Sequence, residues 1–124
     1  MDPLMPRDIT GDVQQVLAAA RAGKGVRPNF LTAYQILDRL PVTIRDRLIA
    51  ERTLGGRGSG VSYAAPSVVS DAAEMLPGIV IEYMDSVGVA VSVAGQQLMP
   101  SNPVCGLYRL APDAEPVAAA DGGA

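Results

Sequence analysis

Residues 65–83, APSVVSDAAEMLPGIVIEY, decide the fold class, because the hydrophobic period changes within them. The first part places apolar residues at helical spacing, with Val69, Ala72, Ala73 and Leu76 on one face. The Pro-Gly pair at 77–78 ends this helix, since proline cannot continue it. The β-branched and aromatic run that follows is typical of a strand, with a helical turn as the alternative. The stretch therefore predicts a helix over 65–76 that leads into a sheet.

Three further helices are predicted before this stretch, over residues 10–22, 30–39 and 42–52. The second has the clearest local signal. Thr32 and Gln35 match a capping box, in which each side chain satisfies a backbone N–H of the other residue. Leu31 and Ile36 stand where a hydrophobic staple belongs. A glycine-rich connector, LGGRGSG at 54–60, separates the third helix from the fourth.

Strand signals dominate the part of the chain after the fourth helix. Valines alternate with small residues over 87–93, a period of two. A tight turn at 94–95 leads into 96–99, and the last strand is predicted over 104–110. The order indicates an α+β domain, with about four N-terminal helices followed by a three- to four-stranded antiparallel β-meander. It also fits the element order of a winged helix.

The 124 residues are predicted to form a single α+β domain over residues 9–110. Residues 1–8 and 111–124 are expected to be disordered tails, because they are rich in small, acidic and breaker residues and show no periodicity. There is no basic region followed by an apolar stretch near residue 1, and Cys105 is the single cysteine. We therefore expect a cytoplasmic protein without disulfides or membrane segments.

The residue inventory excludes several chemistries. The chain has no histidine and one cysteine, which removes Ser-His and Cys-His nucleophile pairs and the usual zinc sites. The glycine connector lacks the lysine of a phosphate-binding loop. We predict no cofactor, no metal and no enzymatic activity. An enzyme would need a carboxylate of raised pKa in a pocket beside one of the four tyrosines, Tyr34, Tyr63, Tyr83 and Tyr108.

Charges are sorted by sign along the chain. Residues 21–60 hold eight basic and three acidic side chains, whereas residues 61–124 hold one basic and seven acidic side chains. Such asymmetry steers an oppositely charged partner. We therefore predict an accessory protein that binds a protein partner or associates with itself through charge-sorted surfaces. The candidate interaction surface consists of Arg45, Arg47, Arg52, Arg57, Asp71 and Glu74.

Nucleic-acid binding is the alternative function. In a winged-helix reading, residues 65–76 form the recognition helix and 87–99 the wing, while Arg45, Arg52 and Arg57 contact phosphates. The weakness is that residues 65–76 contain no cation and carry Asp71 and Glu74. Such a helix would offer little base readout.

Four phrases of the sequence carry a resemblance to other proteins: PNFLTAYQILDRLP at 28–41, RDRLIAER at 45–52, YAAPSVV at 63–69 and VCGLYRL at 104–110. In these phrases, across residues 28–110, the chain resembles small uncharacterised proteins carried on integrative or other mobile elements of GC-rich proteobacteria. The resemblance implies cytoplasmic residence and an accessory role, and it carries over no functional residues.

Overall fold

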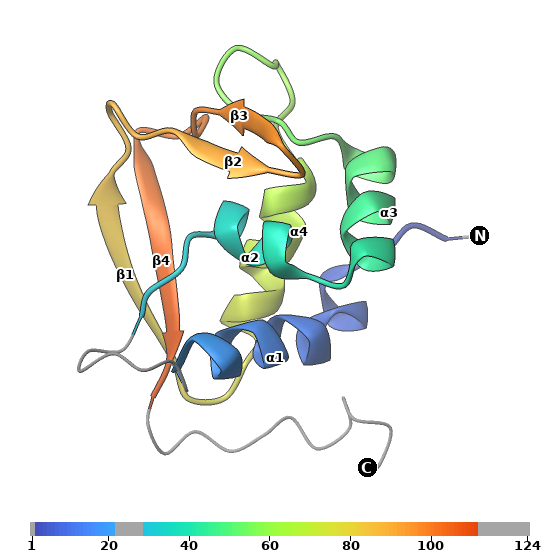
Figure 1. Cartoon of the computed structure of the whole chain (residues 1–124), viewed down its shortest axis with the longest axis vertical. Coiled ribbons are helices and arrows are strands. Elements are labelled where there is room, and N and C mark those ends of the chain that lie inside the picture. The colour runs from blue at the N-terminus through green and yellow to red at the C-terminus, as the bar shows by residue number, and fades with distance from the viewer. Residues whose placement is uncertain (1, 22–28, 112–124) are drawn as a thin grey trace.

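Helix α4 (Ala65–Glu74) lies at the centre of the helical part of the domain in the computed structural model, which describes residues 2–21 and 29–111 (Figure 1). Six of its ten residues are buried, and it packs against every other helix described. The elements around it are η1 (Pro6–Asp8), α1 (Thr10–Arg21), α2 (Ala33–Arg39), α3 (Val42–Arg52), β1 (Ile79–Asp85), β2 (Val91–Val93), β3 (Gln96–Leu98) and β4 (Val104–Leu110). The helices precede the strands, so the predicted α+β class is confirmed.

The capping box at the start of α2 is confirmed. The Gln35 backbone N–H donates to Thr32 Oγ1 over 3.1 Å, and the Thr32 N–H donates to Gln35 Oε1 over 2.8 Å. Thr32 is 3 % exposed, so its own backbone N–H has little access to water. Leu31, just before the cap, exchanges two backbone hydrogen bonds with Tyr108 of β4. The cap therefore fixes both the first turn of α2 and its position beside the sheet.

The strands form two antiparallel pairs, which differ from a continuous meander. β1 pairs with β4 along its whole length, from Ile79 opposite Leu110 to Asp85 opposite Val104. β2 and β3 form a separate short hairpin between them in sequence. Ala94 and Gly95 both have positive φ in its two-residue turn, as a mirror-image hairpin turn requires.

The strand predicted over 87–93 is wrong in its first half, since β2 begins only at Val91. Asp85 Oδ1 accepts a hydrogen bond from the Val87 N–H over 2.9 Å, and the buried Ser86 bonds the backbone of Asn102 and Pro103. These contacts hold the chain in a turn. The alternating valines satisfy strand periodicity, but the N–H groups of Val87 and Val89 bond Asp85 Oδ1 and the Ser86 carbonyl within this turn.

The expected disorder of residues 1–8 is also corrected for the part that the structure describes. Asp2 and Leu4 bond α3, η1 packs against α4 and α1, and Leu4 is 8 % exposed and belongs to the core. The segment shows no hydrophobic periodicity in the sequence, because it is held by residues of α3 that are more than forty positions away. The predicted C-terminal tail, apart from Ala111, lies outside the described residues. Within residues 2–21 and 29–111, no helix has the length and apolar character needed to cross a membrane.

We expect Thr32→Ala to lower the free energy of unfolding by about 1 kcal/mol, because it removes the side-chain acceptor of the Gln35 N–H at the start of α2. Chemical denaturation monitored by circular dichroism measures this change. Thr43→Ala is the matched control, since Thr43 is exposed in the first turn of α3, and we expect a change within about 0.5 kcal/mol. Equal losses in the two variants would contradict the capping role.

Candidate interaction surfaces: the α3 cluster and the tyrosine groove

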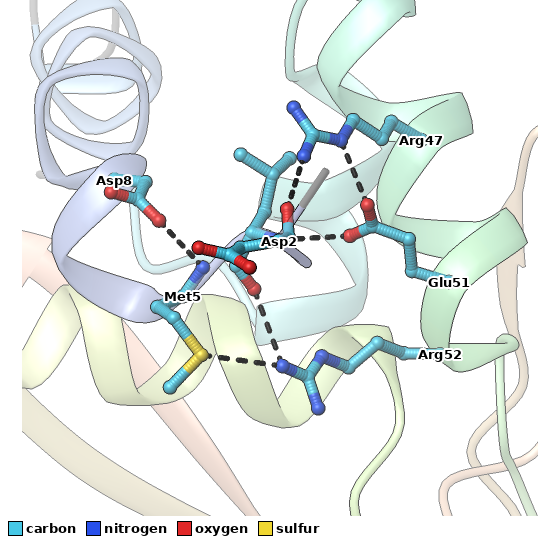
Figure 2. Close-up of polar contacts among 7 residues, drawn as sticks. Asp2, Met5, Asp8, Arg47, Glu51 and Arg52 are labelled. Carbon is cyan, nitrogen blue, oxygen red and sulfur yellow. Dashed lines mark hydrogen bonds and ion pairs between the residues drawn. The ribbon is translucent and has the colours of Figure 1, made fainter.

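Three side chains of α3 bind the backbone of the N-terminal segment Asp2–Asp8; we call them the α3 cluster (Arg47, Glu51 and Arg52). Glu51 Oε1 accepts a hydrogen bond from the Leu4 N–H over 2.9 Å. Arg47 Nη2 donates to the Asp2 carbonyl over 2.7 Å, and Arg52 Nη2 donates to the Leu4 carbonyl over 3.4 Å. Figure 2 shows the cluster converging on the segment. Helical spacing puts Arg47 and Glu51 on the same face of α3, and Arg52 follows Glu51 directly.

The cluster is internally paired as well. Arg47 Nε lies 2.8 Å from Glu51 Oε2, one helical turn away. This ion pair and the Leu4 N–H lower the pKa of the Glu51 carboxyl, with the hydrogen bond from Arg47 as the larger cause. The Glu51 carboxylate is therefore held ionised mainly by Arg47 of the same helix, and further by the Leu4 N–H when the segment lies against α3.

Arg52 connects this cluster to α4. Its guanidinium carbon lies 5.3 Å from the centre of the Tyr63 ring, a cation–π distance. The Tyr63 hydroxyl donates to Asp71 Oδ2 over 2.7 Å. Burial and the bond to Asp71 raise the pKa of Tyr63 to about 12. Arg52, Tyr63 and Asp71 thus form a chain of contacts from the N-terminal segment to the exposed side of α4.

Beyond Tyr63 lies a cavity of about 280 Å³ between α2, α4, β4 and the loop before β4. A second cavity of about 220 Å³ adjoins it under the glycine connector, and the two share Tyr34, Pro66, Ser67, Ser101 and Asn102. We call the joined depression the tyrosine groove. Three of the residues that line the groove are tyrosines, and Asp71 is the single formally charged residue among the described residues that line it. The lining includes Tyr34, Tyr63, Tyr108, Pro66, Ser67, Ser70, Asp71, Ser101, Asn102 and Cys105.

Tyr108 forms the floor of the groove and is fixed by two neighbours. Its hydroxyl makes a short hydrogen bond with Ser70 Oγ of α4. Its ring lies over Gly106, where an added Cβ would stand 2.6 Å from the Tyr108 hydroxyl oxygen. Glycine at 106 is thus what allows this ring position. Burial raises the pKa of both Tyr108 and Cys105, so the phenol and the thiol stay protonated at neutral pH.

The six residues predicted as one interaction surface make separate contacts in the structure. Arg47 and Arg52 are engaged with the N-terminal segment, and Arg45 pairs with its neighbour Asp46 at 2.9 Å. Asp71 lines the groove, and Glu74, a turn further along α4, accepts from Ser70 at 3.5 Å. Arg57 lies apart, exposed on the glycine connector.

Sequence reasoning missed Glu51 as a binding residue and did not bring Tyr34, Tyr63 and Tyr108 together. The i, i+4 spacing of Arg47 and Glu51 was a visible signal for their ion pair. Nothing local in the sequence indicates that Leu4 lies on α3 or that Tyr63 and Tyr108 share a groove, since these pairs come from distant elements.

The structure shows which side of residues 65–76, the recognition helix of the nucleic-acid alternative, stays exposed. The apolar face of α4 contacts α1, α2, α3 and η1, and Val68, Val69, Ala72 and Ala73 are fully buried. A recognition helix must enter the major groove of DNA. Here the side of α4 that stays exposed carries Asp71 and Glu74, which phosphates would repel.

Comparison with known proteins identifies no relative: no protein-family model matches the chain, and no curated protein or solved structure is significantly similar to it. Over residues 2–21 and 29–111, no three cysteine or acidic side chains converge as metal ligands would. Charge, hydroxyl groups and aromatic rings are therefore the chemistry from which a function can be argued.

We expect the Leu4 amide proton to report the ionisation of Glu51. Because the folded-state pKa of Glu51 is lowered, the contribution of its carboxylate to stability is complete above its ordinary pKa of 4.5 and is lost as pH falls through the lowered value. An NMR titration should show the Leu4 amide shift moving with a midpoint below 4.5.

Two variants on α3 test the cause of this shift. Arg47→Gln should raise the midpoint towards 4.5, whereas Arg45→Gln should leave it in place, since Arg45 bonds Asp46. A midpoint at or above 4.5 in the unmodified protein, or a Leu4 amide that does not titrate, would contradict the contact.

Proposed function

We propose that this protein is a non-enzymatic interaction domain whose tyrosine groove binds a basic, extended segment of a protein partner. The main observation in support of this proposal is the lining of the groove. It contains three tyrosines and the carboxylate of Asp71, with no cation among the described lining residues. Cations are attracted both by carboxylates and by aromatic faces. A lysine or arginine side chain of a partner thus complements the groove.

The shape of the groove supports an extended ligand. Its two cavities, of about 280 and 220 Å³, share five lining residues and run from β4 to the glycine connector. Each is small beside the roughly 300–1,000 Å³ typical of drug-sized ligand pockets. Tyrosine is also enriched in protein interfaces, because its ring is apolar and its hydroxyl bonds water or partner groups. These features suit a peptide laid along the surface better than a buried small molecule.

The same residues argue against catalysis. The groove does place a carboxylate, Asp71, beside Tyr63, as the enzyme alternative requires. However, the Tyr63 hydroxyl already donates to Asp71, and its pKa of about 12 keeps it protonated. Cys105 has a raised pKa and no cation among the described groove residues to activate its thiol.

Nucleic-acid binding through Arg45, Arg52 and Arg57 is the weaker candidate. Arg45 pairs with Asp46, and Arg52 bonds Leu4 and stacks on Tyr63. Phosphate binding would have to compete with these contacts. A gel-shift assay with random duplex at low salt tests the alternative, and retarded duplex at micromolar protein would favour it over the peptide ligand.

Two further predictions concern the biological role of the protein and its location in the cell. An accessory role on a mobile genetic element rests on the sequence resemblance over residues 28–110, and cytoplasmic residence rests on the single cysteine. Both are compatible with a domain that binds another protein.

The proposal predicts where a basic peptide binds. We expect an acetylated and amidated Gly-Lys-Gly-Arg-Gly peptide, added to the ¹⁵N-labelled protein, to shift the amide resonances of Ser67–Asp71 and Val104–Gly106. The same peptide with glutamine at both basic positions should shift none of them, because the charge complementarity is lost. Asp71→Asn should weaken binding by about fivefold, equivalent to about 1 kcal/mol.

Asp46→Asn is the matched control, since it removes an exposed carboxylate on α3 that pairs with Arg45. We expect this variant to bind the basic peptide with unchanged affinity. Shifts spread evenly over all acidic surfaces, or equal losses in Asp71→Asn and Asp46→Asn, would overturn the groove as the binding site.

A further inference from the structure

Strand β1 is paired along one edge only. β4 lies against that edge along the whole strand, and it is β4 that packs against α1 and α2 (Figure 1). Among the described residues, none bonds the backbone of β1 on its other edge. An unpaired edge of seven residues presents a row of N–H and C=O groups that another strand can bond.

The register shows which backbone groups lie on this open edge. The Ala111 N–H donates to the Gly78 carbonyl over 2.8 Å just before the strand pair. In an antiparallel ladder the bonded pairs then recur at every second residue, so the even-numbered residues of β1 bond β4. The N–H and C=O groups of Ile79, Ile81 and Tyr83 therefore point away from β4.

The opposite edge of the sheet agrees with this alternation. Tyr108, which stands opposite Ile81, exchanges two backbone hydrogen bonds with Leu31 and so points away from β1. The residue opposite it must likewise point away from β4. The open edge of β1 thus offers an arrangement like the one by which β4 already holds the extended backbone at Leu31.

The side chains of β1 restrict what can pair with this edge. Glu82 and Asp85 are exposed, and the strand contains no lysine, arginine or proline, residues that commonly block an open edge. A second copy is disfavoured, because pairing along the whole strand would set the two Glu82 side chains directly opposite each other. A strand with lysine or arginine at the facing positions is favoured instead.

We propose that the open edge of β1 binds an extended, basic segment of a protein partner as an added strand. Main-chain hydrogen bonds to Ile79, Ile81 and Tyr83 supply the affinity, and Glu82 and Asp85 select basic side chains in the partner. The exposed Tyr83 ring adds an apolar contact beside the edge. The proposal does not rest on the tyrosine groove, since none of these five residues lines it.

Hydrogen exchange of the β1 amides tests the open edge in the protein alone. The amides of Ile79, Ile81 and Tyr83 should exchange about tenfold faster, or more, than those of Val80 and Glu82, which bond β4. Equal protection of all five amides would overturn the proposal, because another part of the chain would then cover the edge.

The probe for binding is the acetylated and amidated peptide Thr-Lys-Val-Lys-Val-Lys-Thr. It should slow exchange at Ile79, Ile81 and Tyr83 and leave Val80 and Glu82 unchanged, because only the first three amides lie on the open edge. The same peptide N-methylated at its five central residues cannot form the ladder and should give no protection. Equal protection by both peptides, or none by either, would overturn the proposal.

Two variants at one exposed position test strand addition. Tyr83→Pro removes an outward N–H and leaves the bonds to β4 in place, whereas Tyr83→Thr keeps the N–H and favours a strand. We expect Tyr83→Pro to bind the probe peptide about tenfold more weakly than Tyr83→Thr. Equal affinities, with both variants folded by NMR, would contradict the added strand.

Further variants separate this site from the groove and from self-association. With affinity measured at the β1 amides, Glu82→Gln should weaken the probe peptide about threefold and Asp71→Asn should leave it unchanged. The reverse pattern would place the peptide in the tyrosine groove and overturn the assignment to β1. A dimer of the protein alone that is lost in Tyr83→Pro would identify a second copy as the occupant, and it would overturn the basic partner.

Discussion

The burial of one face of α4 is the constraint on which the rest of the structure depends. Val68, Val69, Ala72 and Ala73 are all inaccessible to solvent, and the helices α1, α2 and α3 all contact α4. Valine and alanine are small, so neighbouring helices pack closely against this helix. The Pro-Gly pair after α4 turns the chain into β1. The residues before α4 form the glycine connector over the tyrosine groove. Both functional surfaces are therefore attached to one buried helix.

Part of the basic half of the sequence is engaged in contacts within the domain. The arginines of α3 bond backbone carbonyls of the N-terminal segment and two acidic residues of α3 itself, Asp46 and Glu51. Arg52 also lies over Tyr63, which itself bonds Asp71. Exposed ion pairs of this kind contribute little to stability, typically below about 1 kcal/mol. These contacts determine position instead: Arg47 and Arg52 hold the N-terminal segment, and the side of α4 that carries Asp71 and Glu74 stays exposed.

Local signals predicted most of the fold. The bounds of α3, the Thr32 cap and the β4 strand agree with the sequence expectation because a few neighbouring residues determine each of them, whereas α2 begins at Ala33 rather than residue 30 and α4 ends at Glu74 rather than residue 76. The errors arise where distant groups compete. Leu4 is ordered by Glu51, 47 positions away, and Ser86 is fixed by Asn102, 16 positions away. The groove escaped prediction for the same reason, since α2, α4 and β4 each supply part of it.

Native-state hydrogen exchange of the α4 amides tests the central role of this helix most directly. If α4 is the core on which both surfaces depend, the amides of Val69, Ala72 and Ala73 exchange only through global unfolding. Their free energies of opening should then equal the free energy of unfolding measured with denaturant. Opening of α4 at clearly lower free energy than β4 would contradict the account, because the helix would then be a mobile element rather than the support of the groove.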